Sequence, residues 1–161
     1  MNSGMILGLD PGFDRLGWAV AQRDQRSIRV VALGCIQTSK QQSLYTRYAS
    51  LLEQLEAVLA QYQPTEVAME TIYFSKNVST ALPVSEARGV IVGRLLREQL
   101  PIFDYNPMQI KMAVTGSGRA DKAAIAKMLK LQVRLPATPQ LDDALDAVGM
   151  CLTHALLHTQ E

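Results

Sequence analysis

The strongest constraint on the fold is a short hydrophobic run near the start of the chain that ends on an acidic residue. Residues 5–9 read Met-Ile-Leu-Gly-Leu, and Asp10, Pro11 and Gly12 follow directly. Such a run is typical of a buried β-strand. Pro11 lacks the N–H that a central strand needs and Gly12 permits a tight turn, so we expect the strand to end at Asp10. This predicts a carboxylate at the edge of a sheet, although these residues alone are equally compatible with an aspartate that only opens a turn.

Further strand and helix patterns alternate along the rest of the chain. Hydrophobic periodicity and turn residues predict strands at 18–21, 28–36, 66–70 and 101–105, and helices at 44–62, 81–99, 122–133 and 141–158, with a short helix opening at Pro107. Three strands joined by short turns, followed by alternating helices and strands, are typical of an α/β fold with a mixed sheet. The length of 161 residues predicts one domain, residues 1–161.

A second acidic residue ends another predicted strand. Residues 66–70 read Glu-Val-Ala-Met-Glu and finish on Glu70. If the helix at 44–62 is the crossover between this strand and the first one, the two strands are parallel. Asp10 and Glu70 then leave the sheet at the same edge, where open α/β folds bind their ligands.

The final predicted helix carries three more acids, Asp142, Asp143 and Asp146. The first two lie where acids complement the helix dipole, and we interpret Asp142 as such a residue. Asp143 and Asp146 share a helix face, where like charges repel, and Asp146 lies beyond the first turn among apolar neighbours. A divalent cation between these carboxylates would remove the repulsion. Oxygen ligands favour Mg²⁺ or Mn²⁺, and two such ions about 4 Å apart can assist phosphodiester hydrolysis.

The charge distribution is more informative than the formal net charge of +1. Residues 86–134 contain nine Lys and Arg against four acids, whereas residues 135–161 contain four acids and no Lys or Arg. A basic middle followed by an acidic end suits a surface that grips phosphates beside a site that holds cations. The same pattern is also compatible with ordinary solvated helix faces.

The cysteines and histidines carry weaker signals. Cys35 and Cys151 lie far apart in apolar stretches, which predicts isolated buried thiols and a reduced, cytoplasmic setting. No hydrophobic run approaches membrane-spanning length, and the start of the chain reads as a strand rather than a signal peptide. His154 and His158 fall late in the final helix with no acid nearby in sequence, so we interpret them as surface or core positions.

Five segments, in a consistent order and spacing, resemble the bacterial Holliday-junction resolvases of the RuvC type. They are LGLDPG (7–12), AME (68–70), ARGV (87–90), GSGRADK (116–122) and DDALDA (142–147). The resemblance implies a ribonuclease-H-like fold, that is, a five-stranded mixed sheet flanked by helices. It also implies a homodimer that cleaves four-way DNA junctions by paired, symmetric, Mg²⁺-dependent nicks in recombination and repair, and that cooperates with a branch-migration motor.

The resemblance also assigns roles to individual residues. It implies that the metal ligands are Asp10, Glu70, Asp143 and Asp146, and that Lys122 acts with them in catalysis. Further DNA contacts are expected at Tyr73, Phe74, Lys76, Arg88, Lys111 and Arg119. An exposed aromatic ring can stack on an unpaired base, and a lysine can bind a phosphate as a point charge. The competing interpretations are that the two rings pack in the core and that the lysines lie on solvated helix surfaces.

Three alternatives remain at this stage. Sugar kinases and actin-like ATPases share the first motif, but they need a second phosphate-binding domain for which 161 residues leave no room. A related nuclease that processes ribosomal RNA precursors would share Asp10 and a late aspartate. A non-catalytic junction-binding protein would lack at least one of the four acids, and this chain has all of them.

Overall fold

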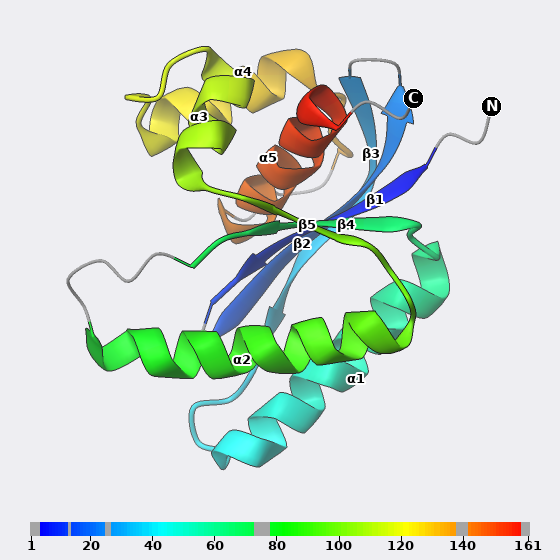
Figure 1. Ribbon diagram of the computed structural model, residues 1–161, viewed down its shortest axis with the longest axis vertical. Helices are drawn as coiled ribbons and strands as arrows, with labels where there is room; N and C mark the ends of the chain where they lie inside the picture. Colours follow the sequence, from blue (N-terminus) through cyan, green and yellow to red (C-terminus); the bar gives the residue numbers. More distant parts are fainter. Residues whose placement is uncertain (1–3, 13, 25–26, 73–77, 138–141, 159–161) are drawn as a thin grey trace.

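The computed structural model describes residues 4–12, 14–24, 27–72, 78–137 and 142–158. Its centre is a sheet with the strand order β3-β2-β1-β4-β5 (Figure 1). The strands are β1 (Met5–Pro11), β2 (Arg15–Asp24), β3 (Ser27–Gln37), β4 (Glu66–Glu70) and β5 (Ile102–Tyr105). β1, β2 and β3 pair in antiparallel fashion, whereas β4 runs parallel to both β1 and β5. The predicted α/β class with a five-stranded mixed sheet is therefore confirmed.

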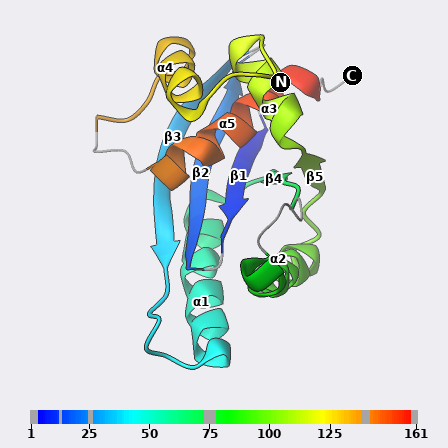
Figure 2. The same cartoon turned by 90° about the vertical axis from the view of Figure 1, so that its left-hand side faces the viewer.

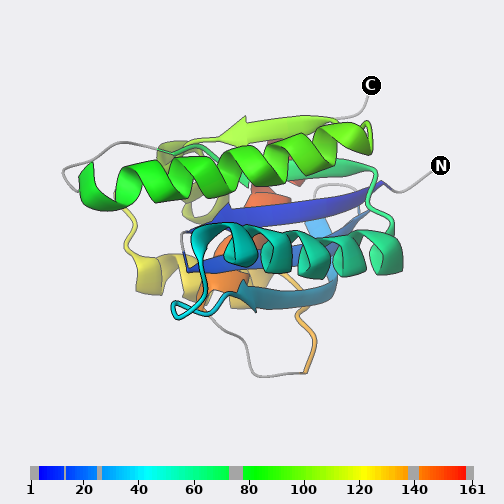
Figure 3. The same ribbon diagram turned by 90° about the horizontal axis from the view of Figure 1, so that it is seen from below.

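Helices cover both faces of this sheet (Figures 1 and 3). One face carries α1 (Leu44–Tyr62) and α2 (Val78–Arg97), and the other carries α3 (Pro107–Thr115), α4 (Lys122–Gln132) and α5 (Asp142–Leu157). Successive residues of a strand point to opposite faces, so β1 contributes to two hydrophobic cores. Leu7 and Leu9 pack in the core that contains Leu55 of α1, whereas Ile6 packs in the core that contains Val148 of α5.

Polar caps explain where several helices begin and end. The side chains of Ser43, Asn106 and Asp121 accept hydrogen bonds from the first turns of α1, α3 and α4, as expected for N-cap residues. Gly116 ends α3 in the left-handed region with φ of 76°, which a glycine adopts without strain. Among the helices that the structure describes, none is both long and apolar enough to cross a lipid bilayer.

The prediction that the first strand ends at Asp10 was wrong by one residue. Parallel pairing of β1 with β4 stops at Leu9, but antiparallel pairing with β2 continues until Pro11 lies opposite Leu16. The Gly12 N–H donates to the carbonyl of Arg15, 2.9 Å away, so the nitrogen of the preceding Pro11 faces the opposite side of the strand. The pairing with β4 has already ended there, so the missing N–H of Pro11 leaves no partner carbonyl of β4 without its donor.

Two glycines bring α5 directly onto the sheet, where Figure 2 shows it crossing the strands. A Cβ atom at Gly8 of β1 would collide with the backbone carbonyl of Ala147, and one at Gly17 of β2 would collide with that of Asp143. The absence of side chains at these positions lets the helix backbone rest against the strands. This close approach places the acidic start of α5 beside the end of β1.

Candidate active site

Three carboxylates converge where β1 ends and α5 begins. Asp10 is the next-to-last residue of β1, and Asp143 and Asp146 lie in the first two turns of α5. One carboxylate oxygen from each lies within 4.8 Å of the others, and all three side chains are half-buried. Asp142, the first residue of the helix, is exposed, in keeping with its interpretation as a dipole-complementing residue.

Glu70 completes the acidic group from the neighbouring strand. It ends β4, which pairs in parallel with β1, and its carboxyl lies close enough to that of Asp10 to raise the pKa of Asp10. Asp10, Glu70 and Asp146 line the same cavity. The structure thus places the four acids named from the sequence at one edge of the sheet, as the crossover through α1 predicted.

The acids destabilise one another's charges. Burial, followed by the proximity of Glu70, raises the pKa of Asp10 from its ordinary value to about 8. Burial also raises the pKa values of Glu70 and Asp146. A divalent cation would relieve this repulsion, and the donor set contains only oxygen, which suits a hard ion such as Mg²⁺ or Mn²⁺. The residues present therefore fit a metal centre.

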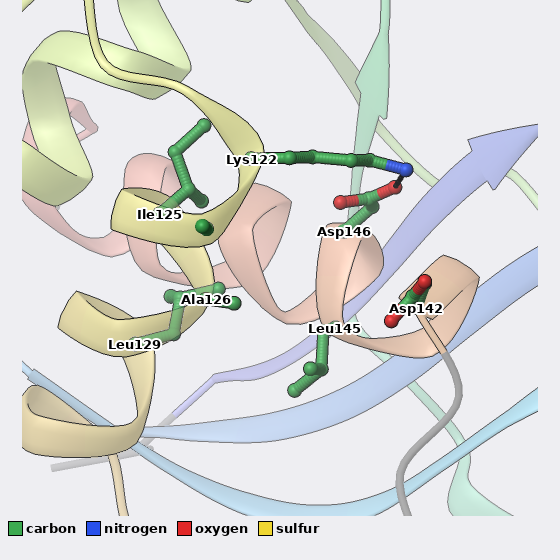
Figure 4. A pocket seen from close by; sticks show the side chains of 8 residues that line it. Lys122, Ile125, Ala126, Leu129, Asp142, Leu145 and Asp146 are labelled. Carbon is green, nitrogen blue, oxygen red and sulfur yellow. Dashed lines mark ion pairs between the residues drawn. The ribbon is translucent and has the colours of Figure 1, made fainter.

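Two lysines line the same cavity as the acidic group. Lys122, the first residue of α4, reaches across to α5, and its Nζ lies 3.3 Å from Asp146 Oδ2 (Figure 4). The negative charge of Asp146 raises the pKa of Lys122, so this lysine is cationic at neutral pH. Its side chain remains 71% exposed, which leaves it free to turn from Asp146 toward a phosphate. Lys111 of α3 lines the same cavity as Asp10 and Glu70.

Two neighbours of Asp143 were not predicted from the sequence. Arg15, at the start of β2, places its Nη1 3.6 Å from Asp143 Oδ2, and the Cys35 Sγ of β3 lies 3.8 Å from the same oxygen. Burial, together with the charge of Asp143, raises the pKa of the Cys35 thiol. The prediction of two buried thiols holds for Cys151, but Cys35 is only half-buried because its strand ends beside the acidic group. In the sequence, only the place of Arg15 at the turn between the first two strands indicated that it could lie near the acids.

The remaining predicted DNA contacts lie in different places. Arg88 of α2 donates to Asp104 Oδ1 over 2.6 Å and is not among the residues that line the cavity of the acids. Arg119 is exposed in the segment that joins α3 to α4. Tyr73, Phe74 and Lys76 lie outside the described residues.

Comparison with known proteins identifies close relatives of this chain. The family model for crossover junction endodeoxyribonuclease RuvC matches residues 6–154. The crossover junction endodeoxyribonuclease RuvC of Petrotoga mobilis is 45% identical over 150 residues, which cover 93% of this chain and 92% of the relative. That of Roseiflexus sp. is 40% identical over 154 residues, which cover 96% of this chain and 92% of the relative.

Solved structures share the same architecture. The RuvC of Thermus thermophilus in complex with a Holliday junction substrate aligns with a TM-score of 0.87 and 28% identity, covering 95% of this chain and 93% of its own. A yeast mitochondrial Holliday junction resolvase aligns with a TM-score of 0.72 over 96% of this chain and 78% of its own. At 12% identity, the second match supports the fold alone.

Proposed function

Because this chain belongs to the RuvC family of crossover junction endodeoxyribonucleases, we propose that it resolves four-way DNA junctions by hydrolysing phosphodiester bonds. The observation that supports this most is the convergence of Asp10, Asp143 and Asp146, with Glu70 lining the same cavity as Asp10 and Asp146. The related RuvC of Thermus thermophilus was solved with a Holliday junction substrate, which favours DNA over ribosomal RNA precursors as the substrate.

The four carboxylates would hold Mg²⁺ or Mn²⁺, with two ions present when substrate is bound. When bound, such ions activate a water molecule and stabilise the leaving oxygen of an in-line displacement. Asp10 and Glu70 contribute ligands from the rigid ends of paired strands, and Asp143 and Asp146 contribute them from a helix packed on those strands. Supports of this kind hold ligand oxygens more firmly than loops do.

Lys122 would neutralise charge on the scissile phosphate. In the free protein it pairs with Asp146, and a bound phosphate would offer it a second anionic partner in the same cavity. A lysine at this position stabilises the additional negative charge that develops as the phosphodiester bond breaks. Lys111, which lines the cavity beside the acids, would hold a neighbouring phosphate.

Contacts with the rest of the junction would come from residues around this cavity. Tyr73 and Phe74 follow Glu70 by three and four residues, so a ring in this segment could stack on an unpaired base near the acids. Lys76, Arg88 and Arg119 would contact the DNA backbone. Arg88 would have to exchange its partner Asp104 for a phosphate.

Paired symmetric nicks require two active sites related by a two-fold axis, so we infer a homodimer. One face of α2 supports this inference, because Leu82 and Leu96 are 66% and 60% exposed there. Gly89 and Gly93 lie between them at helical spacing, and a Cβ at either glycine would meet no atom within 4 Å. Such a face lets a second helix approach closely. A link to a branch-migration motor is supported only by membership of the family.

The experiment that tests the function uses a synthetic four-way junction and the purified chain. With Mg²⁺ we expect paired nicks at symmetric positions that leave 5′-phosphate and 3′-hydroxyl ends, and with Ca²⁺ we expect binding without cleavage. A linear duplex and a ribosomal RNA precursor serve as controls. Cleavage of the RNA in preference to the junction would overturn the proposal.

A further inference from the structure

The far ends of β4 and α5 carry a second group of metal-ligating side chains, separate from the catalytic acids. Glu66 begins β4, whereas Glu70 ends it, and His154 lies in the last turn of α5 with His158 just beyond it. The potential ligand atoms of Glu66, His154 and His158 all lie within 4.8 Å of one another. Glu66 and His154 are buried and His158 is half-buried.

One ring nitrogen in this group lacks a hydrogen bond. The Nε2 atom of His154 is completely buried and has no hydrogen-bonding partner among the described residues. Glu66 Oε2 lies 3.2 Å from it, at ion-pair distance. Two ligands of a tetrahedral ion with bonds of about 2.0 Å lie about 3.3 Å apart, so this pair already has the required spacing.

The surrounding residues orient the ligands as they do around known metal ions. The other ring nitrogen of His154, Nδ1, lies 2.7 Å from the Tyr105 hydroxyl, which holds the imidazole in place. Arg23 donates to Glu66 Oε1 over 3.1 Å, which leaves Oε2 directed toward His154. Phe103 packs against both imidazoles, with ring centroids 4.7 Å from His154 and 4.3 Å from His158.

The protonation states and the helix end also suit a cation. Burial holds the pKa of His154 below its ordinary value, so the imidazole is neutral at physiological pH and can donate a lone pair. Burial opposes ionisation of Glu66, but His154 and Arg23 outweigh it and lower the pKa of this carboxyl. The group lies at the C-terminal end of α5, where the helix dipole favours positive charge and where Arg23 already donates to the carbonyls of Ala155 and His158.

We propose that Glu66, His154 and His158 form a second metal site, which takes an ion of the Zn²⁺ class and lies at the opposite end of β4 and α5 from the catalytic acids. Two imidazoles and one carboxylate match the ligands that Zn²⁺ prefers, whereas the oxygen-only group at Asp10 suits Mg²⁺. The two sites therefore select different ions. An ion at this site would link the end of α5 to β4, so its role would be structural. It would help to hold α5, the helix that carries Asp143 and Asp146, in place on the sheet.

The test measures metal retention by the full-length chain. Chelator-treated protein is dialysed against Zn²⁺ in the presence of excess Mg²⁺, and the bound zinc is measured together with the melting temperature. We expect the wild type to retain one Zn²⁺ per chain and to melt at a higher temperature with zinc. Co²⁺ in place of zinc should give the visible absorption of a tetrahedral site with nitrogen and oxygen ligands.

Two variants locate the ion. His158→Phe keeps a ring against Phe103 but removes a ligand, and it should bind Zn²⁺ at least about ten-fold more weakly; His158→Ala provides the same loss without the ring. The matched control, Asp143→Asn with Asp146→Asn, should retain zinc as the wild type does. The proposal is overturned if the wild type retains no zinc, if both His158 variants retain it unchanged, or if the control loses it.

Discussion

Asp10 and Glu70 lie near the ends of neighbouring parallel strands at the same edge of the sheet, close enough for Glu70 to raise the pKa of Asp10. This contact joins residues that are sixty positions apart and lies beside Asp146 of α5. Two acids this close cannot both ionise freely without a cation or a proton between them. The protonation of this pair therefore affects both metal binding and the pH dependence of the protein's stability.

Asp146→Asn should slow junction cleavage by at least about a hundred-fold, because it removes a carboxylate from the group that we propose holds the catalytic ions. Binding of the junction in Ca²⁺ should change little, since phosphate contacts elsewhere supply most of the affinity. Single-turnover cleavage and a gel-shift titration measure the two effects. Asp142→Asn removes the exposed neighbouring charge and should cleave at nearly the wild-type rate; equal activity in both variants would refute the assignment of Asp146.

The metal-free protein should lose stability as the pH rises from about 5 to about 8. The pKa of Asp10 is raised to about 8 in the folded protein, so the folded state keeps a proton that the unfolded chain releases at lower pH. A group with a raised pKa stabilises the fold below its ordinary pKa, and this contribution is lost as the pH rises through the folded value. Melting temperatures measured with a chelator should therefore fall across this range.

Two comparisons isolate the cause of that pH dependence. Asp10→Asn should flatten most of the decline, because the titrating carboxyl is absent. Excess Mg²⁺ should also oppose it in the wild type, because the ion replaces the proton between the carboxylates. A slope that is the same in wild type and Asp10→Asn would exclude Asp10 as its source.

Lys122→Ala should reduce the cleavage rate by about a hundred-fold while junction affinity changes only a few-fold. The lysine is expected to act on charge that develops at the reacting phosphate, and interactions of this kind affect the rate more than binding. Lys127→Ala on the same helix is the control, since its side chain is exposed and does not line the cavity with Asp146. A matching loss in the two variants would indicate a general electrostatic effect.

Gly17→Ala should lower the free energy of unfolding by about 1–3 kcal/mol, because its Cβ would collide with the backbone carbonyl of Asp143. The displaced helix start should also weaken Mg²⁺ binding. Gly149→Ala is the control within α5: its nearest contacts would be side-chain atoms of Ile110 and Leu129 at 3.7 and 3.8 Å, so it should be neutral or stabilising. Chemical denaturation with and without Mg²⁺ measures both effects. If the free energy of unfolding of Gly17→Ala equals that of the wild type, α5 tolerates a shift at this position.

Leu96→Glu should convert a dimer to a monomer, because it places a charge in the apolar face of α2 that we expect to be the interface. Sedimentation velocity measures the change, and paired nicking should give way to uncoordinated single nicks. Leu131→Glu, at another exposed leucine of the described chain, should leave the oligomeric state unchanged. Identical sedimentation of Leu96→Glu and wild type would place the interface elsewhere.

The sequence was sufficient for features that depend on local chemistry. Hydrophobic periodicity located the helices and strands. Asp10 and Glu70 were identified because each was expected to end a strand, and Asp143 and Asp146 because they share one face of the last helix. The parallel crossover through α1 then implied a common edge for Asp10 and Glu70.

Only the tertiary structure decided which distant side chains meet. Arg15 and Cys35 contact Asp143, Arg88 is paired with Asp104, and His154 lies against Glu66, although no sequence spacing connects these residues. Periodicity reports which face of an element is apolar, but it carries no information on the register in which one element crosses another. Here that register depends on two glycines that let α5 rest on β1 and β2, and the helix then carries Asp143 and Asp146 at one end and His154 at the other.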